Sequence, residues 1–325
     1  MAAGSGTTAG RPSTSEPAVT RNNSLFVARS RHPMHVRTGP ETDAEAGETD
    51  ARATVLNPTP PSGHSPNPGA RSAADPSATV PVVGLLAGLL APITRREVYP
   101  ASGTRIPASR TDLALRMSDG VVVRGWEVNP GRERALVYLG GNGEGLDWLV
   151  PELGARFPDH TSYLLAYRGY GASDGRPSQE ALTRDALAVV DFAAARHPAM
   201  SVDVVGRSLG SGVAMQVAVR RRVVRLVLIT PFDSLVATAA DLFPRLPVRH
   251  LLRDRWDSAA VAHRLAGRVL VVRAGRDAVV RPARTDRLLD VLPADTTVLD
   301  LAEADHRTVH EDPAYWPALT DFLGS

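Results

Sequence analysis

Residues 202–218 read VDVVGRSLGSGVAMQVA, and this stretch decides the fold. Its first four residues form a short apolar run that is typical of a buried strand, while the residues after Gly210 predict a helix that opens with small side chains. Between them lies Gly206-Arg207-Ser208-Leu209-Gly210, which matches the pattern G-x-S-x-G. A strand, a sharp turn and a helix in this order are typical of a turn that lifts a serine hydroxyl above the edge of a sheet.

A glycine-rich turn with an incidental serine is the alternative interpretation, because a pattern of five residues also recurs by chance. The two glycines favour a functional turn, since a side chain at Gly206 or Gly210 would crowd it. We therefore predict that Ser208 is a catalytic nucleophile. The surrounding strand and helix patterns are what make this motif more informative than the five letters alone.

The composition divides the chain of 325 residues into unlike parts. Residues 1–79 are rich in Pro, Ser, Thr, Gly and Ala, and show neither a period of two nor a period of 3.6. Such a sequence buries too little apolar surface to offset its ordering entropy, so we predict that it is disordered. Residues 80–96 form an apolar segment, and residues 97–325 are predicted to form one α/β domain.

The apolar segment begins at Val80, ends at Ile93 and is followed by two arginines. It is interrupted by two prolines and is shorter than a typical transmembrane helix. Three interpretations stay open: a helix packed against the domain, an interfacial membrane anchor, or a signal or anchor of a chain whose true start lies downstream. If the segment spans a membrane, its arginines keep the domain in the cytoplasm. We therefore expect a cytoplasmic protein with a membrane surface as a candidate partner.

Charge and cysteine content argue against several function classes. The formal net charge is +2, and all 37 basic residues are arginine. A nearly neutral domain with few aromatic residues argues against nucleic acid as a partner. The densest basic run, residues 220–222, is typical of a solvated helix end. The chain has no cysteine, so it has no disulfide, no thiolate nucleophile and no thiolate metal site. We expect neither a cofactor nor a metal.

Strand and helix patterns alternate along the domain after an opening hairpin. This order predicts an α/β fold with a mostly parallel sheet and helices on both faces. Ligands bind at the carboxyl ends of the strands in such sheets, so we expect functional residues there. The predicted strands are 112–117, 121–128, 135–138, 162–166, 202–205, 223–229, 268–272 and 296–301, and the predicted helices include 147–156, 179–196 and 313–322.

Two polar residues follow the last two predicted strands. Asp277 comes soon after residues 268–272, and His306 comes soon after residues 296–301. The order Ser, Asp, His is the chain order of one serine-hydrolase fold. In that arrangement His306 accepts the proton of Ser208, while Asp277 orients the imidazole. Two alternatives stay open, because Asp233 is a rival orienting acid and His310 is a rival base.

A glycine-rich loop, LGGNGEG at residues 139–145, follows the strand at 135–138. Acyl transfer requires backbone N–H donors for the developing oxyanion, one just after the nucleophile and one from such a loop. We predict that Leu209 and Asn142 supply these donors. A phosphate-binding loop is disfavoured because the lysine of a P-loop is missing, and a plain turn is the remaining alternative.

A second glycine-rich loop, YRGYGASDG at residues 167–175, follows the strand at 162–166. We predict that it lies at the rim of the site, and that Gly141, Tyr170 and Phe232 contact the substrate. The alternative is a structural turn in which Arg168 is paired with a buried carboxylate.

Taken together, residues 113–323 resemble the α/β-hydrolase superfamily. They look most like its serine hydrolases without a large lid, related to membrane-associated acyl-protein thioesterases and depalmitoylases. The resemblance implies an α/β-hydrolase fold with a small cap or none and a triad of Ser208, Asp277 and His306. Gly140 departs from the pattern, because many members have histidine there. The motifs that carry the resemblance are GGNGE (140–144), YRGYGASDG (167–175), GRSLG (206–210), TPFDSL (230–235), AGRDAVV (274–280) and ADHRTV (304–309).

The reaction implied by this resemblance is hydrolysis of an ester or thioester through an acyl-enzyme on Ser208. The sequence between the strands at 223–229 and 268–272 is too short for a full cap domain. We therefore expect an open site that accepts a small molecule or an acyl group on a larger carrier. Two alternatives stay open: a peptidase or amidase of the same fold, and a non-catalytic binding or scaffolding module that keeps the fold.

Overall fold

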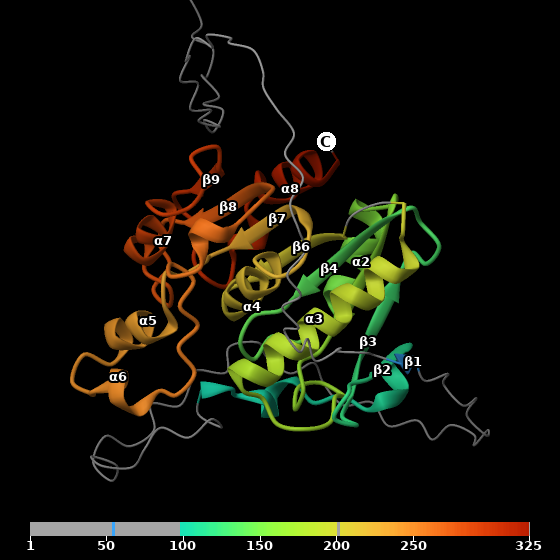
Figure 1. Cartoon of the computed structure of the whole chain (residues 1–325). Helices are drawn as coiled ribbons and strands as arrows, with labels where there is room; N and C mark the ends of the chain where they lie inside the picture. Colours follow the sequence, from blue (N-terminus) through green and yellow to red (C-terminus); the bar gives the residue numbers. More distant parts are fainter. Residues whose placement is uncertain (1–53, 56–97, 200–201, 325) are drawn as a thin grey trace, which may run out of the picture.

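The computed structural model describes residues 54–55, 98–199 and 202–324. In this part of the chain, nine strands form one sheet in the order β1-β2-β3-β5-β4-β6-β7-β8-β9 (Figure 1). Most of the predicted disordered segment, and all of residues 80–96, lie outside the described residues. The strands are β1 (Thr54–Val55), β2 (Leu113–Arg116), β3 (Val122–Val128), β4 (Arg134–Leu139), β5 (His160–Leu165), β6 (Val202–Arg207), β7 (Val223–Ile229), β8 (Arg268–Ala274) and β9 (Thr297–Leu301).

The sheet is mostly parallel, as predicted. Strands β5, β4, β6, β7, β8 and β9 pair in parallel, so their carboxyl ends meet at one edge. Strands β1, β2 and β3 pair antiparallel at the other end of the strand order. The hairpin between β2 and β3 turns at Gly120, whose φ of +83° is a conformation that favours glycine. Strand β1 is a difference from the prediction, since it lies within residues 1–79.

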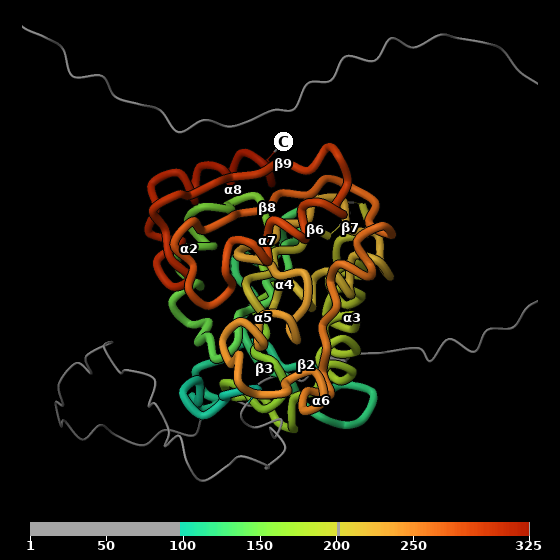
Figure 2. The backbone as a smooth tube through the Cα atoms, turned by 90° about the vertical axis from the view of Figure 1, so that its left-hand side faces the viewer, coloured from blue at the N-terminus to red at the C-terminus, as the bar shows by residue number. Residues whose placement is uncertain are grey.

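Two groups of helices cover the two faces of the sheet (Figure 2). The side chains of β4 show how the period of two builds both cores: Val137 packs with one cluster, and Leu136 and Tyr138 pack with the other. One face carries α3 (Gln179–Arg196), α4 (Leu209–Ala218) and α7 (Pro282–Leu289), and the other carries α2 (Leu149–Arg156) and α8 (Tyr315–Gly324).

The connection between β7 and β8 is a small cap, which confirms the predicted absence of a large one. It contains α5 (Leu235–Leu242) and α6 (Val248–Leu251), which project from the body of the domain at the lower left of Figure 1. In the described part of the chain, no helix combines the length and the apolar character needed to cross a membrane. Short 3-10 helices complete the domain: η1 (Ala101–Thr104), η2 (Ala108–Arg110), η3 (Ala262–Arg264) and η4 (Val309–Glu311).

Candidate active site

Ser208 is the single residue between strand β6 and helix α4. Its backbone has φ 51° and ψ −115°, a strained conformation for a residue other than glycine. The turn is held in place because the Ser208 N–H donates to the Ile229 carbonyl at 2.9 Å. On the far side, the Ser211 hydroxyl donates to the Ser208 carbonyl at 2.6 Å. The helix therefore begins at Leu209, two residues earlier than the small-residue pattern predicts.

The glycines of the motif are required by close approach. A Cβ on Gly206 would lie 2.4 Å from the Gly210 carbonyl oxygen, and a Cβ on Gly210 would lie 1.9 Å from the Leu139 carbonyl oxygen. Both distances are too short for any side chain. The turn at Ser208 thus packs directly on the end of β4, where the loop of residues 139–145 begins.

Asp277 and His306 meet at the carboxyl ends of β8 and β9. The Nδ1 atom of His306 lies 2.6 Å from Oδ2 of Asp277. The other carboxylate oxygen accepts the backbone N–H groups of Val279 at 2.8 Å and Val280 at 2.7 Å. Asp277 is 4% exposed, and the backbone N–H groups of Val279 and Val280 hold its carboxylate in place. The carboxylate therefore fixes the orientation of the imidazole.

The two rival residues have other partners. The Asp233 carboxylate pairs with the Arg284 guanidinium at 3.2 Å. The ring of His310 packs at a tilted angle against Trp148, with 4.7 Å between the ring centroids and 43° between the ring planes. Of the two candidate acids, the structure brings Asp277 to His306. In the described part of the chain, no group of three or more His, Asp or Glu side chains is arranged to hold a metal ion.

Arg207, directly before the serine, joins two loops of the site. Its guanidinium donates to the His306 carbonyl at 2.8 Å and lies 3.1 Å from the Glu144 carboxylate. Glu144 in turn accepts the Gly141 N–H at 2.5 Å and the Tyr138 hydroxyl at 3.3 Å. Burial alone would lower the pKa of Arg207, but Glu144 and other groups hold that pKa above its ordinary value.

Sequence reasoning missed Arg207 and Glu144, although both lie inside quoted motifs. The sequence did indicate that both residues need partners, because a charged side chain in a buried turn or in a glycine-rich loop requires one. The sequence does not show that they are each other's partner, since 62 residues separate them.

The glycine-rich loop of residues 139–145 is held by side chains on both sides. Asn142 donates from Nδ2 to the Val98 carbonyl at 2.7 Å, and its Oδ1 accepts the Tyr170 hydroxyl at 2.7 Å. The N–H of Leu209 belongs to the first turn of α4, where N–H groups lack intrahelical acceptors. The Gly141 N–H, by contrast, is occupied by Glu144. The oxyanion role of Asn142 and Leu209 stays a prediction.

The residues predicted to contact substrate pack into the domain in this structure. Tyr170 and Phe232 are each 2% exposed. Tyr170 packs edge-on against Tyr167, and burial raises the pKa of its hydroxyl. The Phe232 ring lies where a Cβ on Gly212 of α4 would be 2.9 Å from it. Their contact with substrate stays a prediction, as does that of Gly141.

The loop of residues 167–175 contains the buried pairing of Arg168 that the alternative prediction, a structural turn, requires. Arg168 donates to the buried carboxylate of Asp185 at 2.5 and 2.6 Å, and to Asp119 at 2.9 Å. The hydrogen bond from Arg168 lowers the pKa of Asp119. This arginine therefore ties the loop to α3 and to the β2–β3 hairpin.

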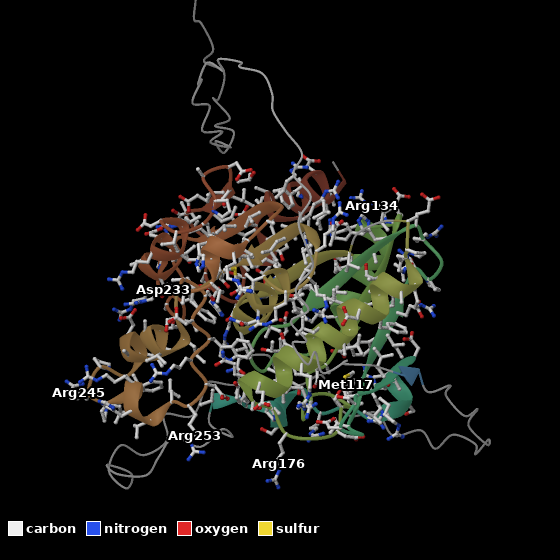
Figure 3. The ribbon with its side chains drawn as sticks, viewed as in Figure 1. Met117, Arg134, Arg176, Asp233, Arg245 and Arg253 are labelled. Atoms are coloured by element: carbon white, nitrogen blue, oxygen red, sulfur yellow. The ribbon has the colours of Figure 1, made fainter. Side chains whose placement is uncertain are left out.

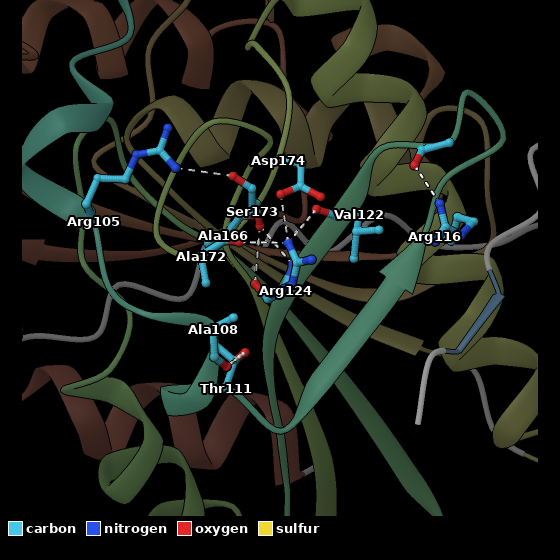
Figure 4. Close-up of polar contacts among 11 residues, drawn as sticks. Arg105, Ala108, Thr111, Arg116, Val122, Arg124, Ala166, Ala172, Ser173 and Asp174 are labelled. Atoms are coloured by element: carbon cyan, nitrogen blue, oxygen red, sulfur yellow. Dashed lines mark hydrogen bonds and ion pairs between the residues drawn. The ribbon is translucent and has the colours of Figure 1, made fainter. Parts of the chain in front are cut away.

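A second set of bonds fastens the same loop to β3 (Figure 4). The guanidinium of Arg124 donates to the Ala172 carbonyl at 2.8 Å and to Asp174 at 3.0 Å. The Ser173 hydroxyl donates to the Ala166 carbonyl at 2.7 Å and accepts the Arg124 N–H at 2.8 Å. The loop is thus held in place on β3, and it carries Tyr170, whose hydroxyl donates to Asn142.

Known proteins resemble this chain at the level of sequence. It is 32% identical to an uncharacterised protein of Mycobacterium tuberculosis over 208 residues, which cover 60% of this chain and 74% of that protein. It is 29% identical to the alpha/beta hydrolase domain-containing protein WAV2 of Arabidopsis thaliana, covering 46% of this chain and 51% of WAV2. It is 31% identical to the lysophosphatidylserine lipase ABHD12 of Xenopus tropicalis, covering 38% and 36%. No protein-family model matches.

A solved structure shows the same fold. The esterase of Exiguobacterium antarcticum matches with a TM-score of 0.53 and 14% identity, covering 65% of this chain and 99% of the esterase. An identity this low shows the fold and not the reaction.

Proposed function

We propose that this chain, which has the α/β-hydrolase fold and resembles proteins of that superfamily, is a serine hydrolase that cleaves a carboxylic ester or thioester through an acyl-enzyme on Ser208. The observation that carries the proposal is the 2.6 Å bond between His306 and Asp277, at the same edge of the sheet as the strained turn of Ser208. Nucleophile, orienting acid and base then follow one another along the chain in the order expected for this fold.

The proposed reaction uses His306 as the proton carrier. With Nδ1 donating to Asp277, Nε2 is the nitrogen that can accept a proton in the neutral imidazole. The Ser208 hydroxyl passes its proton to Nε2 as Oγ bonds to the carbonyl carbon of the substrate. His306 then gives that proton to the departing alkoxide or thiolate, and the bond between the carbon and the leaving group breaks.

Water completes the cycle by the reverse roles. His306 takes a proton from water, whose oxygen attacks the acyl carbon, and the acid is released as Ser208 regains its proton. The N–H groups of Leu209 and Asn142 are the proposed donors to the oxyanion in both halves. The bond that Asn142 donates to the Val98 carbonyl and the bond that it accepts from the Tyr170 hydroxyl support this assignment, because donors must be preorganised to stabilise developing charge.

The choice of an ester or thioester rests on the small cap. A short connection through α5 and α6 leaves little protein to enclose a substrate, which suits an acyl group carried on a larger molecule. One relative is named as a lysophosphatidylserine lipase, and its substrate class supports an acyl ester. The proposal includes thioesters because an acyl-enzyme can form from an ester or from a thioester, and a thiolate is the easier leaving group.

A fluorophosphonate probe, which phosphonylates an activated serine, tests the proposal. Wild-type protein should be labelled, and Ser208→Ala should not. Asp277→Asn should lower the turnover of short acyl esters and thioesters by about 10³–10⁴-fold, because the imidazole is no longer held in the productive tautomer.

The matched control is Asp233→Asn, which removes the rival carboxylate and its pairing with Arg284. It should keep turnover within about threefold while lowering stability. Equal labelling of wild type and Ser208→Ala would refute the nucleophile, and no labelling of either would favour a non-catalytic module. A greater loss of turnover with Asp233→Asn than with Asp277→Asn would show that Asp233, and not Asp277, is the orienting acid.

A further inference from the structure

The small cap exposes a run of apolar side chains. Leu242, Phe243 and Leu246 are 41%, 52% and 39% exposed, and all residues from 242 to 247 are exposed. Consecutive exposed apolar residues are unfavourable in water unless another surface covers them. In the described part of the chain, half of the large hydrophobic side chains that are exposed lie in this one run, and the others are Trp148, Val279 and Val291.

This exposure does not result from loose attachment. The same segment sends Val248, Leu252 and Trp256 inward, and each of them is buried. Trp256 is held further by the bond from its indole N–H to the Tyr99 hydroxyl at 3.1 Å. The apolar tip is therefore presented by a base that is packed into the domain.

Four arginines lie in the same segment as the exposed tip. Arg245, Arg249, Arg253 and Arg255 are exposed, and none of them forms an ion pair within residues 98–199 and 202–324. The one acidic residue between positions 242 and 255 is Asp254, which is buried and accepts the Tyr99 hydroxyl at 2.8 Å. Figure 3 shows Arg245 and Arg253 pointing away from the body of the domain. The surface thus combines apolar side chains with unneutralised positive charge.

We propose that residues 242–255, the cap surface, dock on an anionic lipid bilayer. Leu242, Phe243 and Leu246 would enter the boundary between headgroups and acyl chains, while the arginines contact lipid phosphates. This combination of an apolar tip and flanking cations is the pattern by which peripheral segments bind membranes. A second copy of the chain fits less well, because a twofold contact would place the same arginines against one another.

The position of the cap surface relative to the chain path supports a bilayer. Tyr99 bonds Asp254, and the neighbouring Val98 carbonyl accepts the Asn142 side chain, so the described domain begins beside the cap. The apolar sequence 80–93 ends five residues before Val98 along the chain. This inference does not depend on the proposed hydrolysis.

Co-sedimentation of the full chain with vesicles tests whether the arginines of the cap surface contribute to binding. Vesicles of phosphatidylcholine with 30 mol% phosphatidylserine, a composition of about one anionic lipid in three, should bind more protein than pure phosphatidylcholine, with binding falling as salt rises. Arg245→Gln with Arg253→Gln should weaken binding by about fivefold for each arginine. The matched control, Arg132→Gln with Arg222→Gln, removes the same charge from exposed sites before β4 and β7, at the amino ends of these strands, and should leave binding unchanged.

A second pair of variants tests the apolar tip. Phe243→Ser should weaken vesicle binding about tenfold, because an inserted aromatic ring is removed. Val291→Ser, at an exposed site between α7 and β9, should have no effect. Thermal melting of each variant confirms folding, and the labelling of Ser208 is scored separately.

Three results would overturn the proposal. The first is no binding of wild type to anionic vesicles. The second is equal binding by wild type and the cap variants, which would place membrane contact elsewhere in the chain. The third is a dimer in solution that Phe243→Ser dissociates, which would show that a second copy covers the surface.

Discussion

Replacing Arg207 tests whether the residue before the serine organises the candidate site. The side chains of Arg207 and Glu144 are only 14% and 5% exposed, so Arg207→Met leaves a carboxylate buried without its cation. Removal of one partner from a buried ion pair costs about 3–5 kcal/mol, a large part of the stability of about 5–15 kcal/mol that a typical domain has. The variant also loses the bond to the His306 carbonyl. We therefore expect labelling of Ser208 to slow by about tenfold to a hundredfold, since small misplacements of reacting groups have effects of this size.

Urea denaturation and the rate of fluorophosphonate labelling measure these two effects, at a temperature where the variant is folded. Arg110→Met is the matched control, because its ion pair with Asp147 is exposed and should contribute about 0–1 kcal/mol. Arg207→Lys keeps the charge but not the planar fork, so it should recover only part of the loss. Equal destabilisation by Arg207→Met and Arg110→Met would refute the buried pair. Lower stability with an unchanged labelling rate would refute its role in positioning.

Two further predictions concern the turns of the site. Gly210→Ala should lower stability by about 3 kcal/mol or more in urea denaturation, because its Cβ meets the Leu139 carbonyl; Gly103→Ala, with nothing within 4 Å, should be nearly neutral. Asp305→Ala should cost about 0.5 kcal/mol at pH 7, because Asp305 accepts the N–H groups of Arg307 and Thr308, and these bonds lower its pKa. That stability is present above the unfolded pKa of about 3.9 and is lost as the pH falls through the lower folded pKa. Denaturation from pH 7 to pH 3 should show the variant converge with wild type; a constant difference would contradict the cause.

The order of strands and helices could be predicted because hydrophobic period and turn residues are local signals. In the apolar runs at residues 223–229 and 268–272, residues 226–229 and 269–272 are buried, and both runs form parallel strands of the sheet. The turn at Ser208 was also predictable, since only glycine fits where the backbone approaches closely, and the two glycines are visible in the sequence. The predicted start of α4 was less accurate, because the turn consists of Ser208 alone and the helix begins directly after it.

Pairings between distant side chains could not be predicted in the same way. The bond between Arg207 and Glu144, like those of Asn142 with Val98 and Tyr170, depends on which strand ends become neighbours. The pairing of β1 with β2 is another such case, since two residues carry no periodic signal. Chain order alone did not separate Asp277 from Asp233, because both lie between Ser208 and His306. The bond of Asp277 with His306 and the pairing of Asp233 with Arg284 are seen only in the structure.

The alternation of side chains along β6 explains why an arginine before the serine needs a buried acid. Gly206 faces α4, where its Cβ would meet Ala214. One residue later, Arg207 must point to the opposite face of the sheet, which is covered by α2 and α8. The neighbours there are Tyr138, Glu144 and Tyr315, and Glu144 alone among them supplies a carboxylate. A buried guanidinium at this position needs a carboxylate partner to offset the cost of its burial, and Glu144 of the adjacent glycine-rich loop is that partner. The same pairing then fixes the loop that carries Asn142, so the residue before the nucleophile links the serine, the histidine loop and the proposed oxyanion donors.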